Sequence, residues 1–269
     1  MVPEEHQTGG SAGHADPLLR VANVSKVFGG QVTALRGMSL DLGEGDFVSL
    51  LGPSGCGKST ALRLIAGLTH PTSGQIRWRA GTEPDLGVVF QEPTLAPWST
   101  VFGNVWLPLR LRGISKAAAK DQVEEVIASV GLAGFEGAYP RELSGGMKMR
   151  VSIARAMVTR PKLLLMDEPF AALDEITRFK LNNDVLALQQ RLGCTVIFVT
   201  HSVFESVFLS SRIVVMAARP GRVVHDMPND APYPRDEGFR TSHDYVERCR
   251  AVSAALRDAM EHGAGHEEH

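Results

Sequence analysis

The chain has 269 residues, 43% of them hydrophobic, and its 28 basic and 30 acidic side chains leave a formal charge of −2. This apolar content is enough for a packed core, while the balanced charge provides no general attraction to nucleic acid or anionic lipid. No apolar run approaches the roughly 18 residues of a membrane span, and residues 1–16 do not resemble a secretory signal. We therefore expect a globular chain that is neither secreted nor membrane-spanning, with no nucleic acid as partner.

The N-terminal part of the chain predicts a tail followed by an antiparallel β unit. Residues 1–16 lack periodic apolar positions, so they are predicted to be a disordered tail. Residues 18–28 and 32–42 read as two strands joined by a two-glycine turn. Phe28 ends the first strand and offers a ring face on which a nucleotide base can stack, although taken alone it is more often an ordinary edge-strand aromatic.

A glycine-rich loop lies between a predicted buried strand, residues 46–51, and a predicted helix, residues 60–66. The loop matches the pattern G-x-x-x-x-G-K-[ST], which binds phosphate groups. Its residues are Gly52, Pro53, Ser54, Gly55, Cys56, Gly57, Lys58, Ser59 and Thr60. Strand, loop and helix in this order predict a nucleotide-binding site.

The residues of this loop have distinct expected roles. The glycines let backbone N–H groups turn inward around a polyphosphate, and the helix start adds partial positive charge. Lys58 is expected to reach the β- and γ-phosphates, and Ser59 to offer its hydroxyl to Mg²⁺. Thr60 is expected to cap the helix or to touch the α-phosphate. The loop therefore predicts a magnesium–nucleotide complex.

The three cysteines, Cys56, Cys194 and Cys249, lie far apart without metal-ligand spacing, which favours a reducing cytosol. Two interpretations of Cys56 stay open at this point. It is either an exposed, alkylatable thiol or simply a small residue in a tight loop.

Polar residues end three further predicted strands. Gln91 ends the strand at residues 87–91, and His201 follows the strand at residues 195–200. Because the carboxyl ends of parallel strands border the ligand crevice of an α/β sheet, both side chains are placed to meet a γ-phosphate or its metal. Taken alone, a single glutamine or histidine is more often structural.

Paired carboxylates end the third of these strands. Four apolar residues precede Asp167 and Glu168, as expected of a strand buried on both faces with its tip in the crevice. Two acids so close to a buried strand need a compensating charge, and a magnesium–nucleotide complex supplies one.

Residues 92–158 are predicted to form a helical insertion between two strands of the sheet. Residues 92–112 contain several prolines and no clean period, so they suggest either a surface loop with its own small core or a docking surface. From Lys116 the pattern is helical and stops at Gly131. Its apolar face consists of Val123, Val126, Ile127 and Val130.

A second anion-binding helix start is predicted at Ser144. Its hydroxyl can cap the helix, and Gly145 and Gly146 leave the first N–H groups sterically open. Another helix follows Asp174. Its predicted apolar face consists of Leu181, Val185, Leu188 and Leu192.

The C-terminal part predicts two more strands, at residues 212–216 and 222–227. Residues 228–240 are rich in proline and charge and suggest a linker, and residues 245–260 suggest a surface helix. The histidines of residues 262–269 favour a solvated tail over a weak metal site.

The order of these motifs resembles the ATP-binding subunit of ATP-binding cassette (ABC) transporters. The motifs are the phosphate loop, Gln91, the Leu-Ser-Gly-Gly run at residues 143–146, the acids after residue 166, and His201. The resemblance covers roughly residues 18–225. It implies an α/β fold: a P-loop NTPase (ABC ATPase) core with an N-terminal antiparallel β-subdomain and a helical insertion subdomain. The expected ATPase domain is residues 17–227, followed by a C-terminal part at residues 228–269.

The resemblance also implies roles for single residues. Phe28 would stack on adenine, and Lys58, Ser59 and Asp167 would hold the phosphates and Mg²⁺. Gln91 would contact the metal and the attacking water. Glu168 matches the general base, and His201 the switch histidine on the γ-phosphate.

The remaining motifs imply a partner. In this family Ser144, Gly145 and Gly146 would contact the ATP of a second subunit, and Asp174 lies on a loop that crosses the interface. The implied assembly is an ATP-dependent, head-to-tail homodimer at the cytoplasmic face of the inner (plasma) membrane. There it would bind transmembrane permease subunits and, through them, serve a solute-binding protein.

One departure from the family pattern is Met147, where the signature usually has Gln. With residues 169–178 and 216–222, this variant resembles importers for nitrate, sulfonate, taurine or pyrimidine precursors. The alternative is a soluble ABC-type mechanical ATPase acting in DNA repair or translation. A single phosphate loop and the absence of a long heptad run favour transport.

Overall fold

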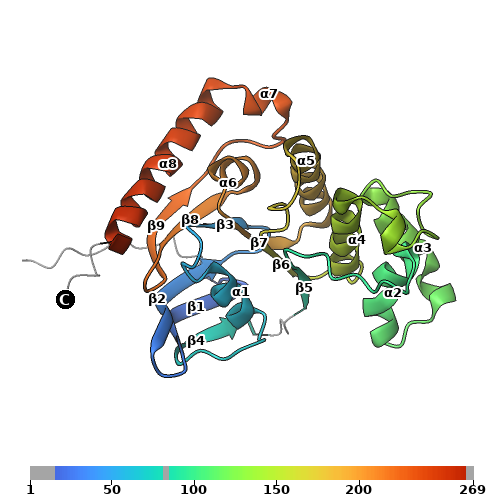
Figure 1. Ribbon diagram of the computed structural model, residues 1–269, viewed down its shortest axis with the longest axis horizontal. Helices are drawn as coiled ribbons and strands as arrows, with labels where there is room; N and C mark the ends of the chain where they lie inside the picture. Colours follow the sequence, from blue (N-terminus) through green and yellow to red (C-terminus); the bar gives the residue numbers. More distant parts are fainter. Residues whose placement is uncertain (1–15, 81–84, 265–269) are drawn as a thin grey trace, which may run out of the picture.

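The computed structural model describes residues 16–80 and 85–264 (Figure 1). The predicted tail up to residue 15 and the final residues 265–269 lie outside the described part. So do the side chains beyond Glu261, which include the histidines considered as a weak metal site.

The N-terminal strands form a small antiparallel sheet, as the sequence predicts. It has the order β2-β1-β4. Its strands are β1 (Leu19–Phe28), β2 (Val32–Leu42) and β4 (Ser73–Trp78). Apolar side chains such as Val21, Leu35 and Met38 pack with the helix α1 (Lys58–Ile65) and one face of the larger sheet.

The larger sheet has six strands in the order β5-β6-β7-β3-β8-β9. They are β3 (Phe47–Leu51), β5 (Leu86–Val89), β6 (Leu163–Asp167), β7 (Thr195–Thr200), β8 (Arg212–Ala217) and β9 (Arg222–Pro228). All pairs are parallel except β8 with β9. The carboxyl ends of β3, β5, β6 and β7 therefore meet at one edge of the sheet, where the predicted site residues follow.

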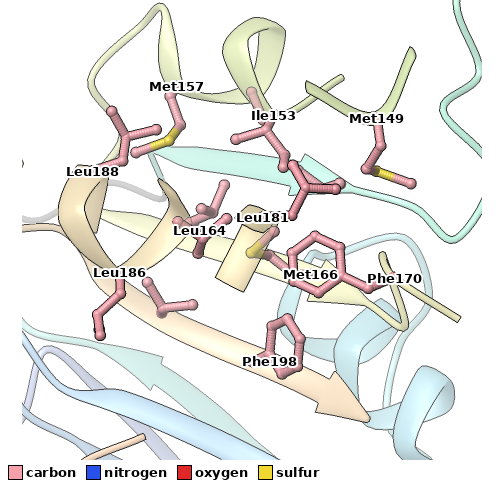
Figure 2. Packing of buried hydrophobic residues seen from close by; sticks show 14 of the residues in the cluster. Met149, Ile153, Met157, Leu164, Met166, Phe170, Leu181, Leu186, Leu188 and Phe198 are labelled. Carbon is pink, nitrogen blue, oxygen red and sulfur yellow. The ribbon is translucent and has the colours of Figure 1, made fainter. Parts of the chain in front are cut away.

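Both faces of this sheet are covered. In β7, Ile197 and Val199 pack toward α1 and the antiparallel sheet, while Val196 and Phe198 pack toward helices on the other face. Figure 2 shows residues of α4 (Gly145–Met157) and α5 (Glu175–Leu192) meeting side chains of β6 and β7. This burial explains why these strands read as continuous apolar runs.

The insertion between β5 and β6 is helical, and Figure 1 shows it at one side of the molecule. It contains α2 (Val101–Leu111), α3 (Lys116–Ser129), a short 3₁₀ turn (Pro140–Glu142) and α4. The expectation of an irregular segment over residues 92–112 was wrong for α2. Thr100 caps this helix by accepting from the N–H of Gly103 at 3.2 Å, and the helix tolerates Pro108 in its interior.

The C-terminal part packs on the sheet rather than trailing from it. Arg235 is only 4% exposed, and its guanidinium donates to five backbone carbonyls, among them those of Val207 and Ser210. After α7 (Glu237–Arg240), α8 (His243–Ala264) contacts β8 and α6 (Val203–Leu209). Residues 228–240 thus anchor the C-terminal helix.

No helix among the described residues has the length and apolarity to cross a bilayer.

Candidate functional site

The phosphate loop closes around the ammonium group of Lys58, which is only 4% exposed. Its Nζ donates to the carbonyl of Gly52 at 2.7 Å and to that of Pro53 at 2.9 Å. Gly57 has a φ of +87°, and a Cβ there would lie 2.7 Å from the carbonyl oxygen of Ala34. The loop conformation therefore requires glycine, and it folds back over the lysine head group.

The helix after this loop begins earlier than the sequence suggested. It starts at Lys58, and Gly57 occupies the N-cap position without a side-chain cap. The expectation that Thr60 caps the helix was wrong, since Thr60 lies inside the first turn. The first N–H groups of α1 are therefore not capped by a side chain, which leaves them available to bind an anion at this helix start.

A hydroxyl and a carboxylate oxygen meet beside the loop. The Ser59 hydroxyl donates to Oδ1 of Asp167 at 2.8 Å. Burial raises the pKa of the Asp167 carboxyl, which the hydrogen bond from Ser59 only partly offsets. A partly buried carboxylate beside a hydroxyl fits a hard cation such as Mg²⁺, because hard oxygens are its preferred ligands and a cation would stabilise the charge.

Glu168 sits at the centre of a small charged cluster. Its Oε1 lies 3.7 Å from Nζ of Lys58, and its Oε2 lies 3.2 Å from Nδ1 of His201. Its backbone has a φ of +45°, a conformation uncommon for a residue with a side chain. The structure thus brings Lys58, at the start of α1, together with Glu168 and His201, which directly follow β6 and β7.

Two other predicted site residues are accessible. Gln91 is exposed and follows β5 by two residues, at the same carboxyl edge as the acids. Phe28 ends β1 and is 44% exposed, with Nζ of Lys26 5.0 Å from its ring centroid. Both side chains can therefore reach a ligand without displacing a packed core.

The second predicted anion site lies in the insertion. Ser144 is exposed and caps α4, accepting from the N–H of Met147 at 3.3 Å. A Cβ on Gly146 would lie 2.6 Å from Cγ2 of Thr177, so any larger residue there would require the Thr177 side chain to move. Met147 packs against the hydrophobic core, so the departure from Gln adds buried apolar surface.

Asp174 lies next to this helix start. It is exposed and caps α5 by accepting from the N–H of Thr177 at 2.9 Å, a backbone hydrogen bond that lowers the pKa of its carboxyl. The neighbouring Leu173 lies 3.8 Å from where a Cβ on Gly145 would stand. Ser144 and Asp174 therefore belong to one exposed surface.

Two features of the loop were not visible in its own sequence. Cys56 is fully buried and burial raises the pKa of its thiol, so the exposed-thiol interpretation was wrong and the small-residue interpretation is confirmed. Gly221, which lies between β8 and β9, packs closely against the loop. A Cβ there would lie 2.3 Å from the carbonyl oxygen of Cys56.

Related proteins align with most of this chain. The family model described as ABC transporter matches residues 35–171. An uncharacterized ABC transporter ATP-binding protein of Methanocaldococcus jannaschii is 47% identical over 90% of this chain and 92% of its own length. The nitrate import ATP-binding protein NrtD of Synechocystis is 42% identical, with coverages of 89% and 95%. The aliphatic sulfonates import ATP-binding protein SsuB of Bacillus cereus is 44% identical, with coverages of 86% and 93%.

Solved structures agree with this relationship. CbiO1 from Clostridium perfringens, part of an ABC transporter complex, aligns with a TM-score of 0.73 and 26% identity, covering 90% of this chain and 97% of that chain. The ATP-binding cassette MJ0796, a dimer bound to ADP and Pi, aligns with a TM-score of 0.68 and 32% identity, covering 80% and 100%. Sequence and fold together show that this chain belongs to the ATP-binding subunits of ABC transporters and hydrolyses ATP.

Proposed function

We propose that this chain is the energy-coupling subunit of a membrane importer for a small solute such as nitrate, a sulfonate, taurine or a pyrimidine precursor. The printed names of two relatives, a nitrate and an aliphatic sulfonates import protein, support this class of solute. The chain works at the cytoplasmic face of the membrane, bound to permease subunits that receive solute from a binding protein.

In this proposal the loop binds ATP in one orientation. The ring of Phe28 stacks on adenine, and Lys58 with the N–H groups at the start of α1 holds the phosphates. Ser59, Asp167 and Gln91 would hold Mg²⁺, which when bound neutralises charge on the phosphate oxygens. The raised pKa of Asp167 and its hydrogen bond from Ser59 support this assignment.

Glu168 acts as the general base for the attacking water. Its carboxylate accepts a proton from water as the oxygen attacks the γ-phosphorus, and His201 orients the carboxylate through the 3.2 Å contact. The second ring nitrogen of His201 then faces the γ-phosphate. Lys58, 3.7 Å from the same carboxylate, stabilises the negative charge of the phosphates.

The active unit is a head-to-tail homodimer with two ATP molecules between the subunits. One observation carries this proposal: the helix start at Ser144 is exposed, and the described part of the chain has no cluster of three or more metal-ligating side chains beside it. Ser144, Gly145 and Gly146 therefore contact the nucleotide held by the partner's phosphate loop, and Asp174 crosses the interface. A two-fold axis forms both contacts at once.

The test separates ATP binding from hydrolysis. Glu168→Gln keeps the size of the side chain and removes the base, so this variant is expected to bind ATP and hydrolyse it far more slowly. Size-exclusion chromatography with light scattering is expected to show a dimer with ATP and Mg²⁺ and a monomer with ADP.

Adding a bulky cation at the second helix start tests the trans contact. Glu168→Gln with Ser144→Arg is expected to stay monomeric with ATP, because the arginine cannot fit against the other subunit's nucleotide. The matched control is Ser115→Arg, since Ser115 is also an exposed N-cap serine but belongs to α3. A double variant at Ser144 that still dimerises with ATP would contradict the proposed assembly.

A second experiment addresses the membrane partner. Trp98 is 82% exposed in the insertion, which leaves a large apolar side chain for a permease to cover. Purification of the native complex from membranes is expected to recover permease subunits with this chain, and their identity would point to the solute. Recovery of the chain as a membrane-free homodimer would favour a mechanical ATPase instead.

A further inference from the structure

The position of His201 is set by its turn rather than by packing, because its side chain is 52% exposed. The turn between β7 and α6 is closed by side chains. The Thr200 hydroxyl accepts from the N–H of Ser202 at 3.0 Å, and the Ser202 hydroxyl accepts from the N–H of Glu205 at 3.3 Å. The Thr200 hydroxyl also donates to Oε2 of Glu205. Glu205 therefore holds both ends of the turn that carries His201.

The other carboxylate oxygen of Glu205 points to a different loop. Its Oε1 lies 3.7 Å from Nε of Arg178 on α5. A terminal nitrogen of Arg178 donates to the carbonyl of Leu173 at 3.0 Å. Leu173 belongs to the loop that joins Glu168 to α5, so this one carboxylate connects the loop of Glu168 with the turn of His201.

The carboxyl of Glu205 is buried in this arrangement, which disfavours its charged form. Glu205 is 7% exposed, and burial raises the pKa of its carboxyl. The charged groups that act on it are Arg178, His201 and Glu168. Ionising a buried carboxylate costs free energy, which the hydrogen bond from Thr200 and the charge of Arg178 partly offset.

We propose that Glu205 is a positioning residue for ATP hydrolysis, which keeps Glu168 and His201 in contact by joining their two loops through Thr200 and Arg178. Its contacts are with Thr200, Ser202 and Arg178, so it is expected to act on the chemical step and not on binding. The inference rests on the roles proposed above for Glu168 and His201, and it adds a residue and a connection to them.

The first test is Glu205→Gln, which keeps the shape and removes the charge. We expect kcat to fall by about tenfold to a hundredfold, because small displacements of catalytic groups reduce kcat by this order. KM for ATP is expected to change by less than about twofold. The melting temperature is expected to fall, because Arg178 loses its anionic partner. A purely structural role predicts the same fall in melting temperature with kcat per folded molecule unchanged.

The matched control is Asp184→Asn. It removes another arginine–carboxylate pair between helices, with Arg150 at 2.6 Å, that is not connected to either loop. Its kcat is expected to stay within about twofold of the wild type.

Two further variants keep the proposal testable if Glu205→Gln folds poorly. Thr200→Val removes only a hydroxyl and is expected to lower kcat with KM unchanged. Arg178→Met is also expected to lower kcat with KM unchanged. Combining it with Glu205→Gln is expected to lower kcat little further, since both substitutions remove the same connection between Glu205 and Arg178. Normal kcat in all three single variants, or full additivity in the double variant, would overturn the proposal.

This failure is distinguishable from failure of the proposed function. Full turnover in Glu168→Gln would refute the assignment of the general base. An inactive Glu168→Gln together with a fully active Glu205→Gln would leave that assignment intact and refute only the role of Glu205.

Discussion

The ammonium nitrogen of Lys58 lies 3.7 Å from Oε1 of Glu168. Lys58 follows β3 and Glu168 follows β6, and these strands both pair with β7 in the sheet. Strand order therefore places this ammonium beside the proposed base, and their sequence neighbours Ser59 and Asp167 are hydrogen-bonded at 2.8 Å. ATP binding is expected to exchange the carboxylate and carbonyl partners of Lys58 for phosphate oxygens.

Lys58→Ala is expected to weaken ATP binding and hydrolysis by at least about a hundredfold. Hydrogen bonds from a charged group contribute about 1.5–3 kcal/mol each, and this ammonium has more than one phosphate oxygen to reach. Equilibrium binding of a fluorescent ATP analogue and steady-state turnover measure the two effects. Lys162→Ala, at an exposed lysine before β6, is the matched control. Near-normal turnover of Lys58→Ala would refute its role in charge stabilisation.

Gly221→Ala is expected to lower ATP affinity by about tenfold or more. The added methyl group would lie 2.3 Å from the carbonyl oxygen of Cys56 and 2.6 Å from that of Ala34, so the loop has to shift. Gly137→Ala is the control, because a Cβ there meets nothing within 4 Å. Equal ATP affinities of the two variants, measured by calorimetry, would show that the loop tolerates the displacement.

The native protein is expected to react very slowly with thiol reagents at neutral pH. All three cysteines are buried, and burial raises the pKa of Cys56 and brings those of Cys194 and Cys249 to about 11. Since the thiolate is the reactive form, a raised pKa leaves little of it below pH 9. A colorimetric thiol assay is expected to detect the three groups only after unfolding. Rapid labelling that Cys56→Ser abolishes would show that the loop opens in solution.

Trp98→Ala is expected to leave the ATPase activity of the isolated subunit largely intact and to uncouple it from transport in the reconstituted complex. Trp98 is 82% exposed, whereas Trp106 packs against the core and donates to the carbonyl of Ile114 at 3.1 Å. Of the two tryptophans in residues 92–112, only Trp98 is thus largely accessible to a partner. Met260→Ala, at another exposed apolar residue, is the control. Equal losses in both assays would show that Trp98 only stabilises the insertion.

The sequence by itself determined the parts of this protein whose physics is local. Hydrophobic runs predict the strands, because strands buried on both faces need apolar side chains throughout. The glycines around Lys58 and the cap at Ser144 predict two helix starts with accessible N–H groups. The general rule that carboxyl ends of parallel strands meet was enough to group Asp167, Glu168 and His201 in advance.

The tertiary structure decided what depends on contacts between distant segments. The helix α2 has no clean apolar period because its sides face different neighbours, and its proline suggested a loop. The burial of Cys56 and the support from Gly221 arise where β8 and its following turn close behind the phosphate loop. The link from Glu205 through Arg178 to Leu173 joins α6, α5 and a loop, and no spacing in the sequence encodes it. Such contacts follow from strand order and helix packing, which bring together residues that share no local pattern.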